Sequence, residues 1–317
     1  MFLVTTAIKQ TFDKSNKMLF LGEWCFLYDY KDEYLSLDYD KLKYHWSDEK
    51  KIEKDFLYLE NIYKEYLKLM TQNLNKIHEI RMSERYWEII IGPWLRYFID
   101  IVFDRYSSLK LASQTYKITN TCILISENEN LTPHSMLDFN QKCSEDFWNH
   151  HIFSVIIKNI KIPYFKKKYI LKNKKTVNKK ESYFKVFYKK IESIFIKLNK
   201  NIYIKASYFD TISLIKLYFK IRQFPILFGP EIDLRFDNKF NKKIRSEINF
   251  HNSSSEFKNI LNQLITDQIP LSYIENFSDI LLFNKKNYPK KIKKILTANS
   301  YAFDDPFKIW TANKIQE

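Results

Sequence analysis

Glycine is scarce in this sequence: its 317 residues include only Gly22, Gly92 and Gly229. Three isolated glycines cannot form a GxGxxG or GxxxxGK[ST] phosphate loop, and neither HExxH nor GxSxG occurs. The sequence therefore gives no support to a P-loop enzyme, a dinucleotide-dependent oxidoreductase, a zinc protease of the HExxH type or a GxSxG hydrolase. We expect each glycine to mark a position where a side chain does not fit.

Cysteine is equally rare. Cys25, Cys122 and Cys143 lie far apart, and no CxxC pair is present. An odd number of cysteines at such spacings predicts neither a disulfide framework nor a zinc site. We therefore expect a protein of a reducing compartment, with no bound metal and no resident cofactor.

Long apolar runs are also lacking. Residues 1–10, MFLVTTAIKQ, have no positively charged start, and their apolar stretch is too short for a signal peptide. The longest apolar region, residues 89–103, is interrupted by Arg96 and Asp100, so it does not predict a membrane span. The sequence predicts a cytoplasmic protein whose contact with the inner membrane face is at most peripheral.

Positive charge is abundant but local. The chain has 52 Lys and Arg against 37 Asp and Glu, a net charge of +15, and only seven of the 52 are Arg. Residues 158–205 hold 16 Lys and two Glu, so this segment carries +14 and the rest of the chain +1. The excess of Lys over Arg is typical of an AT-rich genome, and we interpret the segment as a solvated insertion. It could contact a polyanion or an anionic membrane surface, whereas the scarcity of Arg disfavours nucleic acid.

Short apolar runs alternate with long amphipathic segments. Residues 2–7 (FLVTTA), 17–25 (KMLFLGEWC) and 121–126 (TCILIS) have the pattern of buried strands. Two long helices are predicted at 47–78 and 83–109, and shorter helices follow in the second half. This alternation predicts an α/β protein in which helices dominate.

The chain ends on what has the pattern of a new βα unit. Residues 292–297 predict a strand, and an amphipathic stretch follows to residue 314. We expect a second domain to begin at 291–317, after a first domain of residues 1–290 that contains the 158–205 insertion. A lone strand leaves backbone groups unpaired, so the remainder of that second domain is expected to lie outside this chain.

Several polar residues stand at the predicted strand ends. Thr5 and Thr6 close the first strand, and Gly22, Glu23 and Trp24 close the second. Ligands of open α/β sheets bind at the carboxyl ends of the strands, so Glu23 could act as a base and the threonines could meet a sugar or a phosphate. The alternative is a plain strand-end turn with Trp24 packed into the core.

Two further motifs surround the long helices. His45 and Trp46 stand at the entrance of the first, where an imidazole could be a general base and an indole could stack on a sugar. The alternative is a hydrophobic staple, with Trp46 on the helix and His45 solvated. Gly92 and Trp94 flank a proline in the second helix; a restart there would present free N–H groups to an anion, and a kink would not.

Several of these segments occur together in a recognisable order: FLVTTA, LFLGEWC, YHW, LNKIH, RYWEIIIGPWL, FDRY and the final TANSYAFDDPFKIWTANKI. In this combination the chain resembles a family of transferases encoded among bacterial O-antigen and surface-polysaccharide biosynthesis genes. The resemblance is specific over residues 1 to 108, fades through the Lys-rich middle and returns over the last hundred residues.

The resemblance implies two facing Rossmann-like domains of the GT-B type, with the acceptor held by the first and an activated sugar by the second. Members of that family are longer and carry a Gly-rich, QHGG-like motif beyond the point where this chain ends. The chain is thus similar to an N-terminal half, truncated as its second domain begins. The resemblance places the nucleotide-sugar donor site in the missing half. A split gene with a separate donor-domain chain, a truncated gene product or an incompletely assembled sequence would each give such an ending.

The resemblance also suggests roles for the retained motifs. His45 or Glu23 would take the proton of the acceptor hydroxyl. Arg85 and Arg105 would neutralise phosphate. A sugar-stacking wall would be formed by Trp24, Trp46 and Trp94, and the remaining substrate contacts would come from Thr5, Thr6, Gly22 and Gly92.

The predicted function is a glycosyltransferase-like transferase of surface-polysaccharide or O-antigen synthesis, or its acceptor-side half, incomplete and inactive alone. It would use a nucleotide sugar as co-substrate and a glycan or lipid-linked acceptor. The alternative is a non-enzymatic binding or assembly subunit that docks a donor-domain partner or the membrane surface, the latter through residues 158–205.

Overall fold

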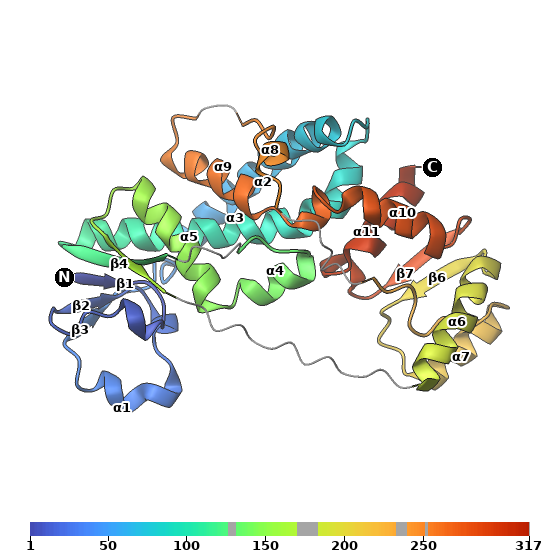
Figure 1. Ribbon diagram of the computed structural model, residues 1–317, viewed down its shortest axis with the longest axis horizontal. Helices are drawn as coiled ribbons and strands as arrows, with labels where there is room; N and C mark the ends of the chain where they lie inside the picture. Colours follow the sequence, from blue (N-terminus) through green and yellow to red (C-terminus); the bar gives the residue numbers. More distant parts are fainter. Residues whose placement is uncertain (126–130, 170–182, 233–239, 251–252, 317) are drawn as a thin grey trace.

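The computed structural model describes residues 1–125, 131–169, 183–232, 240–250 and 253–316, without the side chains of 183–186 (Figure 1). Its strands are β1 (Phe2–Val4), β2 (Met18–Phe20), β3 (Tyr39–Lys41), β4 (Asn120–Ile125), β5 (Phe165–Lys168), β6 (Ile202–Lys205) and β7 (Lys294–Thr297). Its α-helices are α1 (Lys31–Tyr34), α2 (Glu49–Ile77), α3 (Glu84–Thr115), α4 (Met136–Lys142), α5 (Asp146–Asn159), α6 (Tyr183–Leu198), α7 (Thr211–Lys220), α8 (Lys242–Arg245), α9 (Glu256–Gln268), α10 (Phe277–Asn287) and α11 (Asp305–Gln316).

The first sheet is parallel, with the strand order β3-β2-β1-β4-β5. Leu3 of β1 is in register with Leu19 of β2 on one side and with Thr121 of β4 on the other. The chain builds outward from β1 to β3 and then crosses back to the opposite side of β1. The strand order therefore reverses between β1 and β4, which is the position where open parallel sheets bind their ligands.

Helix α3 passes through the centre of the molecule. The hydroxyl of Ser83 accepts a hydrogen bond from Tyr86 N and caps its first turn. The helix continues through Pro93 without a restart, and it packs against α2, α5, α9 and α11. Gly92 lies on a close contact, since a Cβ at this position would stand 2.9 Å from the Tyr63 hydroxyl. With 32 residues, α3 is roughly 48 Å long.

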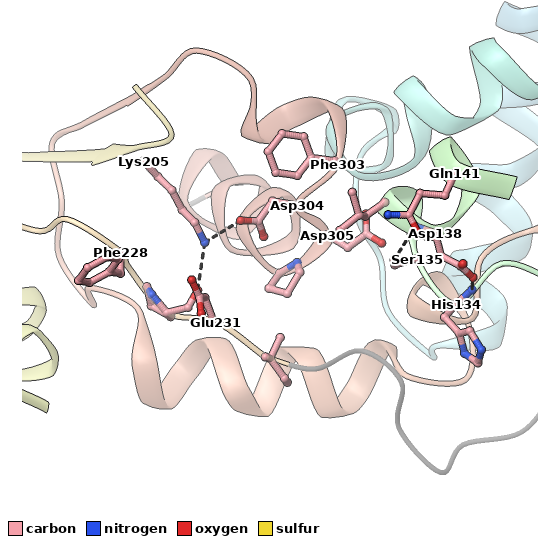
Figure 2. Close-up of a pocket in the computed structure, with 14 residues that line it drawn as sticks. His134, Ser135, Asp138, Gln141, Lys205, Phe228, Glu231, Phe303, Asp304 and Asp305 are labelled. Atoms are coloured by element: carbon pink, nitrogen blue, oxygen red, sulfur yellow. Dashed lines mark hydrogen bonds and ion pairs between the residues drawn. The ribbon is translucent and has the colours of Figure 1, made fainter. Parts of the chain in front are cut away.

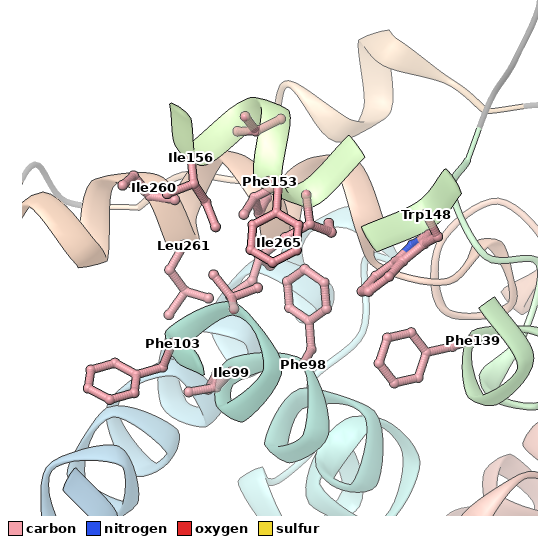
Figure 3. Close-up of a cluster of buried hydrophobic side chains, with 14 of the residues drawn as sticks. Phe98, Ile99, Phe103, Phe139, Trp148, Phe153, Ile156, Ile260, Leu261 and Ile265 are labelled. Carbon is pink, nitrogen blue, oxygen red and sulfur yellow. The ribbon is translucent and has the colours of Figure 1, made fainter. Parts of the chain in front are cut away.

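The main core forms where α3, α4, α5 and α9 meet (Figure 3). Phe98 of α3 packs edge-on against Phe139 of α4 and Trp148 of α5, with ring centroids 6.2 and 6.4 Å away. These three side chains are fully buried. Aliphatic side chains of α9 close the cluster from the other side, namely Ile260, Leu261 and Ile265. Burial of this face, rather than helix propensity, holds the long helices in place.

A second, smaller sheet consists of β6 and β7, paired in parallel with Tyr203 opposite Ile295. Its own core includes Tyr203, Tyr288, Phe307 and Trp310. Strand β7 does not join the first sheet. Its partner β6 lies inside the segment 158–205 that the sequence analysis treated as an insertion, so this small sheet begins at residue 202. The division of the chain at residues 290 and 291 stays a prediction.

The small sheet is attached to the start of α3 through α11. Tyr86 of α3 donates a hydrogen bond to Asn313 of α11 (3.4 Å), and Gln316 donates one to Ser83 (2.6 Å). In Figure 1 the five-stranded sheet lies at one end of the molecule and β6–β7 at the other, with α2, α3 and α9 between them. Helix α3 thus connects the two sheets.

The predicted α/β class is confirmed, as are the strands at β1, β2, β4 and β7 and the long helices α2 and α3. Strands β3 and β5 were not predicted, because their sequences YDK and FKKK contain no apolar run. Residues 170–182 of the Lys-rich segment lie outside the described residues. None of the described helices is long and apolar enough to cross a bilayer.

Replacing Phe98 by alanine tests the role of the main core. We expect Phe98→Ala to lower the free energy of unfolding by about 3–5 kcal/mol, because it removes a fully buried ring and leaves a cavity. The neighbouring Tyr97, 55% exposed on the same helix, is the matched control, and Tyr97→Ala should change stability by about 0.5 kcal/mol or less. Urea unfolding monitored by circular dichroism compares the two. Equal effects would show that α3 is not held by this cluster.

Candidate functional site

The carboxyl edge of the first sheet carries a set of polar and aromatic side chains. Thr5 and Thr6 follow β1 and are buried. The indole N–H of Trp24, which follows β2, donates to the backbone carbonyl of Thr5 (3.0 Å). Gly22 makes this possible, since a Cβ there would stand 2.3 Å from the Trp24 ring. The sequence-based expectation that Gly22 marks a position closed to a side chain is confirmed.

The buried carboxylate of Asp104, on α3, interacts with three side chains. The Tyr44 hydroxyl donates to Oδ1 (2.8 Å), His45 Nε2 lies 2.9 Å from the same oxygen, and Arg105 is paired with Oδ2. Burial by itself raises the pKa of Asp104, but the hydrogen bonds from His45 and Tyr44 and the charge of Arg105 outweigh it and lower that pKa. Asp104 is therefore held as a carboxylate in a buried position.

The same cluster reaches Trp24 and α5. The Arg105 guanidinium lies 5.8 Å from the Trp24 ring centroid, and the Tyr44 ring lies 6.4 Å from it. Arg105 also donates to the Asn149 side chain from Nε (3.1 Å) and Nη2 (2.9 Å). We call Trp24, Tyr44, His45, Asp104 and Arg105 the Asp104 cluster. It joins the segment after β2 and the segment before α2 to α3 around one charged centre.

The two candidate bases differ in accessibility. The His45 side chain is only 1% exposed, and its Nδ1 has no hydrogen-bond partner among the described residues. The Glu23 side chain is 78% exposed and pairs with Lys41 at the end of β3. A base must reach a substrate hydroxyl, so Glu23 can do this without rearrangement and His45 cannot. The alternative reading in which His45 is solvated is wrong.

Trp46 packs as the staple interpretation describes. Its indole N–H donates to Asp55 of α2 (2.9 Å), and its ring stacks on Phe103 of α3 at 6.3 Å. The residue is partly buried against the main core. Its indole therefore joins α2 to α3.

Three predicted site residues lie away from the Asp104 cluster. Arg85 is exposed and pairs with Glu88, and it precedes Arg105 by twenty residues, or roughly 30 Å along α3. Trp94 is fully buried and stacks on Phe98 at 5.1 Å, so it packs in the core and offers no face to a sugar. Gly92 lies within the unbroken helix, whose backbone N–H groups are engaged there. The helix does not restart at Pro93, so the anion-site interpretation has no support, and the kink stays a prediction.

Two members of the site were not singled out from the sequence. Asp104 was recognisable only as the last position of a polar row, spaced by four residues, along an otherwise apolar helix. Asn149 on α5 had no signal, because its role depends on Arg105, 44 positions earlier. At the switch point itself, Asp146 of α5 accepts a hydrogen bond from Ala7 N (3.3 Å), and burial raises its pKa.

A cleft of about 590 Å³ opens between α4 and the small sheet (Figure 2), and we call it the seam cleft. One wall is formed by α4 and the two residues that precede it, within residues 134–141. The other walls are the end of β6 with residues 228–232, and the residues 303–306 that lead into α11. The last residue of β6 and the segment that follows β7 thus line this cleft, and α4 is the next helix after β4 along the chain.

Lys205, the last residue of β6, points into the cleft. Its ammonium pairs with Asp304 (2.6 Å; Figure 2). It also donates to the Tyr288 hydroxyl (3.0 Å) and the Pro230 carbonyl (3.1 Å). An ammonium has three N–H donors, and three partners are present. Lys205 is therefore a fixed part of the wall and has no unused donor for a ligand.

Asp305 forms the back of the cleft and is completely buried. Its carboxylate accepts hydrogen bonds from Met136 N of α4 (2.9 Å), the Ser272 hydroxyl (2.6 Å) and the Tyr273 hydroxyl (2.8 Å), and it pairs with Lys308 (2.9 Å). A buried carboxylate with this many partners ties its neighbours together rigidly. Asp305 therefore sets the position of α4 relative to α11.

The loop that closes the cleft is held by a second buried carboxylate. Glu192 of α6 accepts backbone hydrogen bonds from Leu227, from Phe228 (2.9 Å) and from Gly229 (3.0 Å). Burial raises the pKa of Glu192, and these hydrogen bonds oppose the rise. Gly229 has φ +73°, a left-handed conformation that favours glycine, and a Cβ there would stand 3.0 Å from the Tyr203 hydroxyl.

Comparison with known proteins gives one match. A family model described as LIC12162 family transferase matches residues 1–317. No curated protein and no solved structure matches the chain. Within the described residues, no group of His, Cys, Asp and Glu side chains could hold a metal ion.

Removing the charge of Asp104 tests the centre of the cluster. Asp104→Asn leaves the buried His45 and the partly buried Arg105 without their anion, and we expect a loss of about 3 kcal/mol of stability at neutral pH. Because the pKa of Asp104 is lower in the folded protein than in the unfolded chain, its charge stabilises the fold above the ordinary carboxyl pKa. This stabilisation is lost as the pH falls from that value through the lower pKa of the folded state. The difference between wild type and variant should therefore shrink below about pH 4. Urea midpoints across pH measure it.

The exposed Asp29 supplies the control for this experiment. Asp29→Asn should leave the urea midpoint nearly unchanged at every pH. A loss of stability in Asp104→Asn that is the same at acidic and neutral pH would contradict a charged Asp104.

Proposed function

The chain belongs to the LIC12162 family of transferases, and from this premise we propose that it is a glycosyltransferase-like enzyme of surface-polysaccharide or O-antigen synthesis, or its acceptor-side half. We further propose an arrangement of the GT-B type, in which the domain that contains the first sheet holds the acceptor. The nucleotide sugar is a co-substrate, and no resident cofactor takes part.

The seam cleft is the observation that carries this proposal. The carboxyl end of β4 leads into α4, which lines one wall, and the carboxyl ends of β6 and β7 lead to the others. Ligands of parallel α/β sheets bind outside the carboxyl ends of the strands. A cleft that two such sheets share is suited to bring two substrates together, as a transferase requires.

The lysines in and beside the cleft support an acceptor rather than a diphosphate. Lys205 lines the cleft and is paired with Asp304. Lys308 and Lys142 do not line it, but they are paired with the lining residues Asp305 and Asp138, the latter at 3.1 Å. A diphosphate in the cleft would have to break one of these pairs, whereas a neutral sugar can accept and donate hydrogen bonds beside them. We therefore place the donor's diphosphate beyond the described residues, on a separate donor-domain chain or segment.

In the proposed reaction the acceptor hydroxyl oxygen forms a bond to the anomeric carbon of the sugar. The bond from that carbon to the nucleotide diphosphate breaks, and the hydroxyl proton passes to a carboxylate. We assign Glu23 as that base because it is accessible at the carboxyl edge of the first sheet. Glu23 does not line the cleft, so the reacting hydroxyl lies at this edge and an extended glycan acceptor reaches from it to the cleft. His45, paired with Asp104, acts as a positioning residue that holds the adjoining loop.

Arg105 and Trp24 complete the proposed acceptor side. Arg105 uses three of its five N–H groups on Asp104 and Asn149, which leaves two for a phosphate or a hydroxyl. Trp24 is only partly buried, so part of its ring can pack against a sugar. Thr5 and Gly22 hold Trp24 in place, and Thr6 is buried beside Thr5.

Transfer assays with a panel of nucleotide sugars and a surface-glycan acceptor test the proposal, with product detected by mass spectrometry. They are run with the chain alone and with a candidate donor-domain partner. We expect Glu23→Gln to lower transfer by at least roughly 100-fold, the range of general base catalysis. Glu33→Gln, at an exposed glutamate paired with Lys9, should leave it unchanged.

His45→Ala separates positioning from base catalysis. We expect a smaller loss of transfer, without a change in the pH profile, and a lower unfolding midpoint. If His45→Ala abolishes transfer and removes the acidic limb of the profile while Glu23→Gln is active, the assignment of the base is wrong. Binding of the acceptor without transfer in any combination would instead favour an assembly subunit.

A further inference from the structure

Exposed lysines concentrate where the end of α10 meets the start of β7. Residues 285–294 contain six lysines and no acidic residue, a charge of +6 in ten positions. The six are Lys285, Lys286, Lys290, Lys291, Lys293 and Lys294, and all are exposed. None of them is ion-paired with a carboxylate among the described residues. Their charge therefore faces solvent uncompensated.

Two hollows adjoin on this surface. One, of about 530 Å³, lies between α10 and α11 and includes Lys285 and Lys290. The other, of about 360 Å³, follows β7 and α11 and includes Lys293. Both are lined by Lys314, and neither is lined by an acidic side chain among the described residues. The seam cleft differs sharply, because the lysine that lines it, Lys205, is paired with Asp304.

Helix electrostatics and composition do not account for this charge. Lys285 and Lys286 stand in the last turn of α10, where cations complement the helix dipole. The other four lie beyond the helix, so the dipole does not explain them. The general excess of Lys in this protein explains why the basic residues of 285–294 are lysines, but it does not explain why no acidic residue accompanies them. On α2, for comparison, residues 49–54 carry three lysines and two glutamates.

Exposed aliphatic side chains accompany the lysines. Leu282 of α10 is 68% exposed, Leu296 of β7 45% and Ile315 of α11 57%. Lysines interspersed with exposed aliphatics are typical of surfaces that bind the headgroup region of anionic bilayers. Nucleic-acid surfaces rely instead on arginine and exposed aromatic platforms. Residues 285–294 contain no arginine, and Tyr288 and Trp310 are both buried; Tyr301, which lines the second hollow, is a single aromatic that is 57% exposed.

We propose that these lysines and aliphatic side chains form a surface that binds bilayers rich in anionic phospholipids, and we call it the C-terminal lysine surface. It differs in place from the Lys-rich segment 158–205. Each lysine held at an anionic membrane contributes about fivefold to binding, so six provide a substantial attraction. The attraction is screened by salt, since the Debye length is about 10 Å at 0.1 M. This inference does not depend on the transferase proposal.

The test is sedimentation of the full chain with phosphatidylcholine vesicles, with and without phosphatidylglycerol. The key variant carries Lys290→Glu, Lys291→Glu and Lys293→Glu. We expect binding only to the anionic vesicles, weakened by salt, and reduced roughly 100-fold in this variant. A glutamine version of the same three substitutions should lose binding in the same direction, and circular dichroism confirms that both are folded.

A matched variant controls for overall charge. Lys190→Glu, Lys197→Glu and Lys200→Glu change the net charge by the same amount at exposed positions of the Lys-rich segment, and they should retain binding within a few-fold. Equal losses in both variants, or a loss in the matched variant alone, would overturn the proposal. So would release of the protein from vesicles by soluble glycerol 3-phosphate, which would indicate a pocket for a single phosphate.

Discussion

Burial of α3 is the constraint on which the rest of this structure depends. Its apolar face is buried, with the side chains of Trp87, Trp94 and Phe98 completely inaccessible to solvent. Helices from both halves of the chain pack against it. One end of α3 carries the Asp104 cluster beside the first sheet, and the other end anchors α11 and the small sheet. Because a packed helix is stiff, side chains that touch no ligand determine how the two carboxyl edges face each other.

Buried charges organise both sites in the same way. Asp104, Glu192 and Asp305 each lose hydration, and each regains hydrogen bonds from several elements at once. A buried carboxylate is tolerated only with such partners, so its position specifies how those elements meet. The lysines of residues 285–294 are the opposite case: they remain hydrated and uncompensated, which is the condition for attraction to a distant anionic surface.

Prediction from the sequence succeeded where the signal is local. The apolar runs of β1, β2 and β4 and the periodicity of α2 and α3 are properties of neighbouring residues. It failed for β3 and β5 because these short strands have few apolar side chains. It failed for β6 because this short strand lies within the Lys-rich segment. It also grouped Arg85 and Trp94 with the site, although the length and rotation of α3 place them elsewhere.

By itself the sequence determined the α/β class, the long helices and the polar residues at strand ends such as Thr5, Glu23 and Trp24, because periodicity and strand termini are written in adjacent positions. Only the tertiary structure decided that Asp104 would face His45 and that β7 would pair with β6, ninety residues earlier. Such contacts follow from which apolar faces are buried together, and that choice depends on the whole core rather than on any single segment.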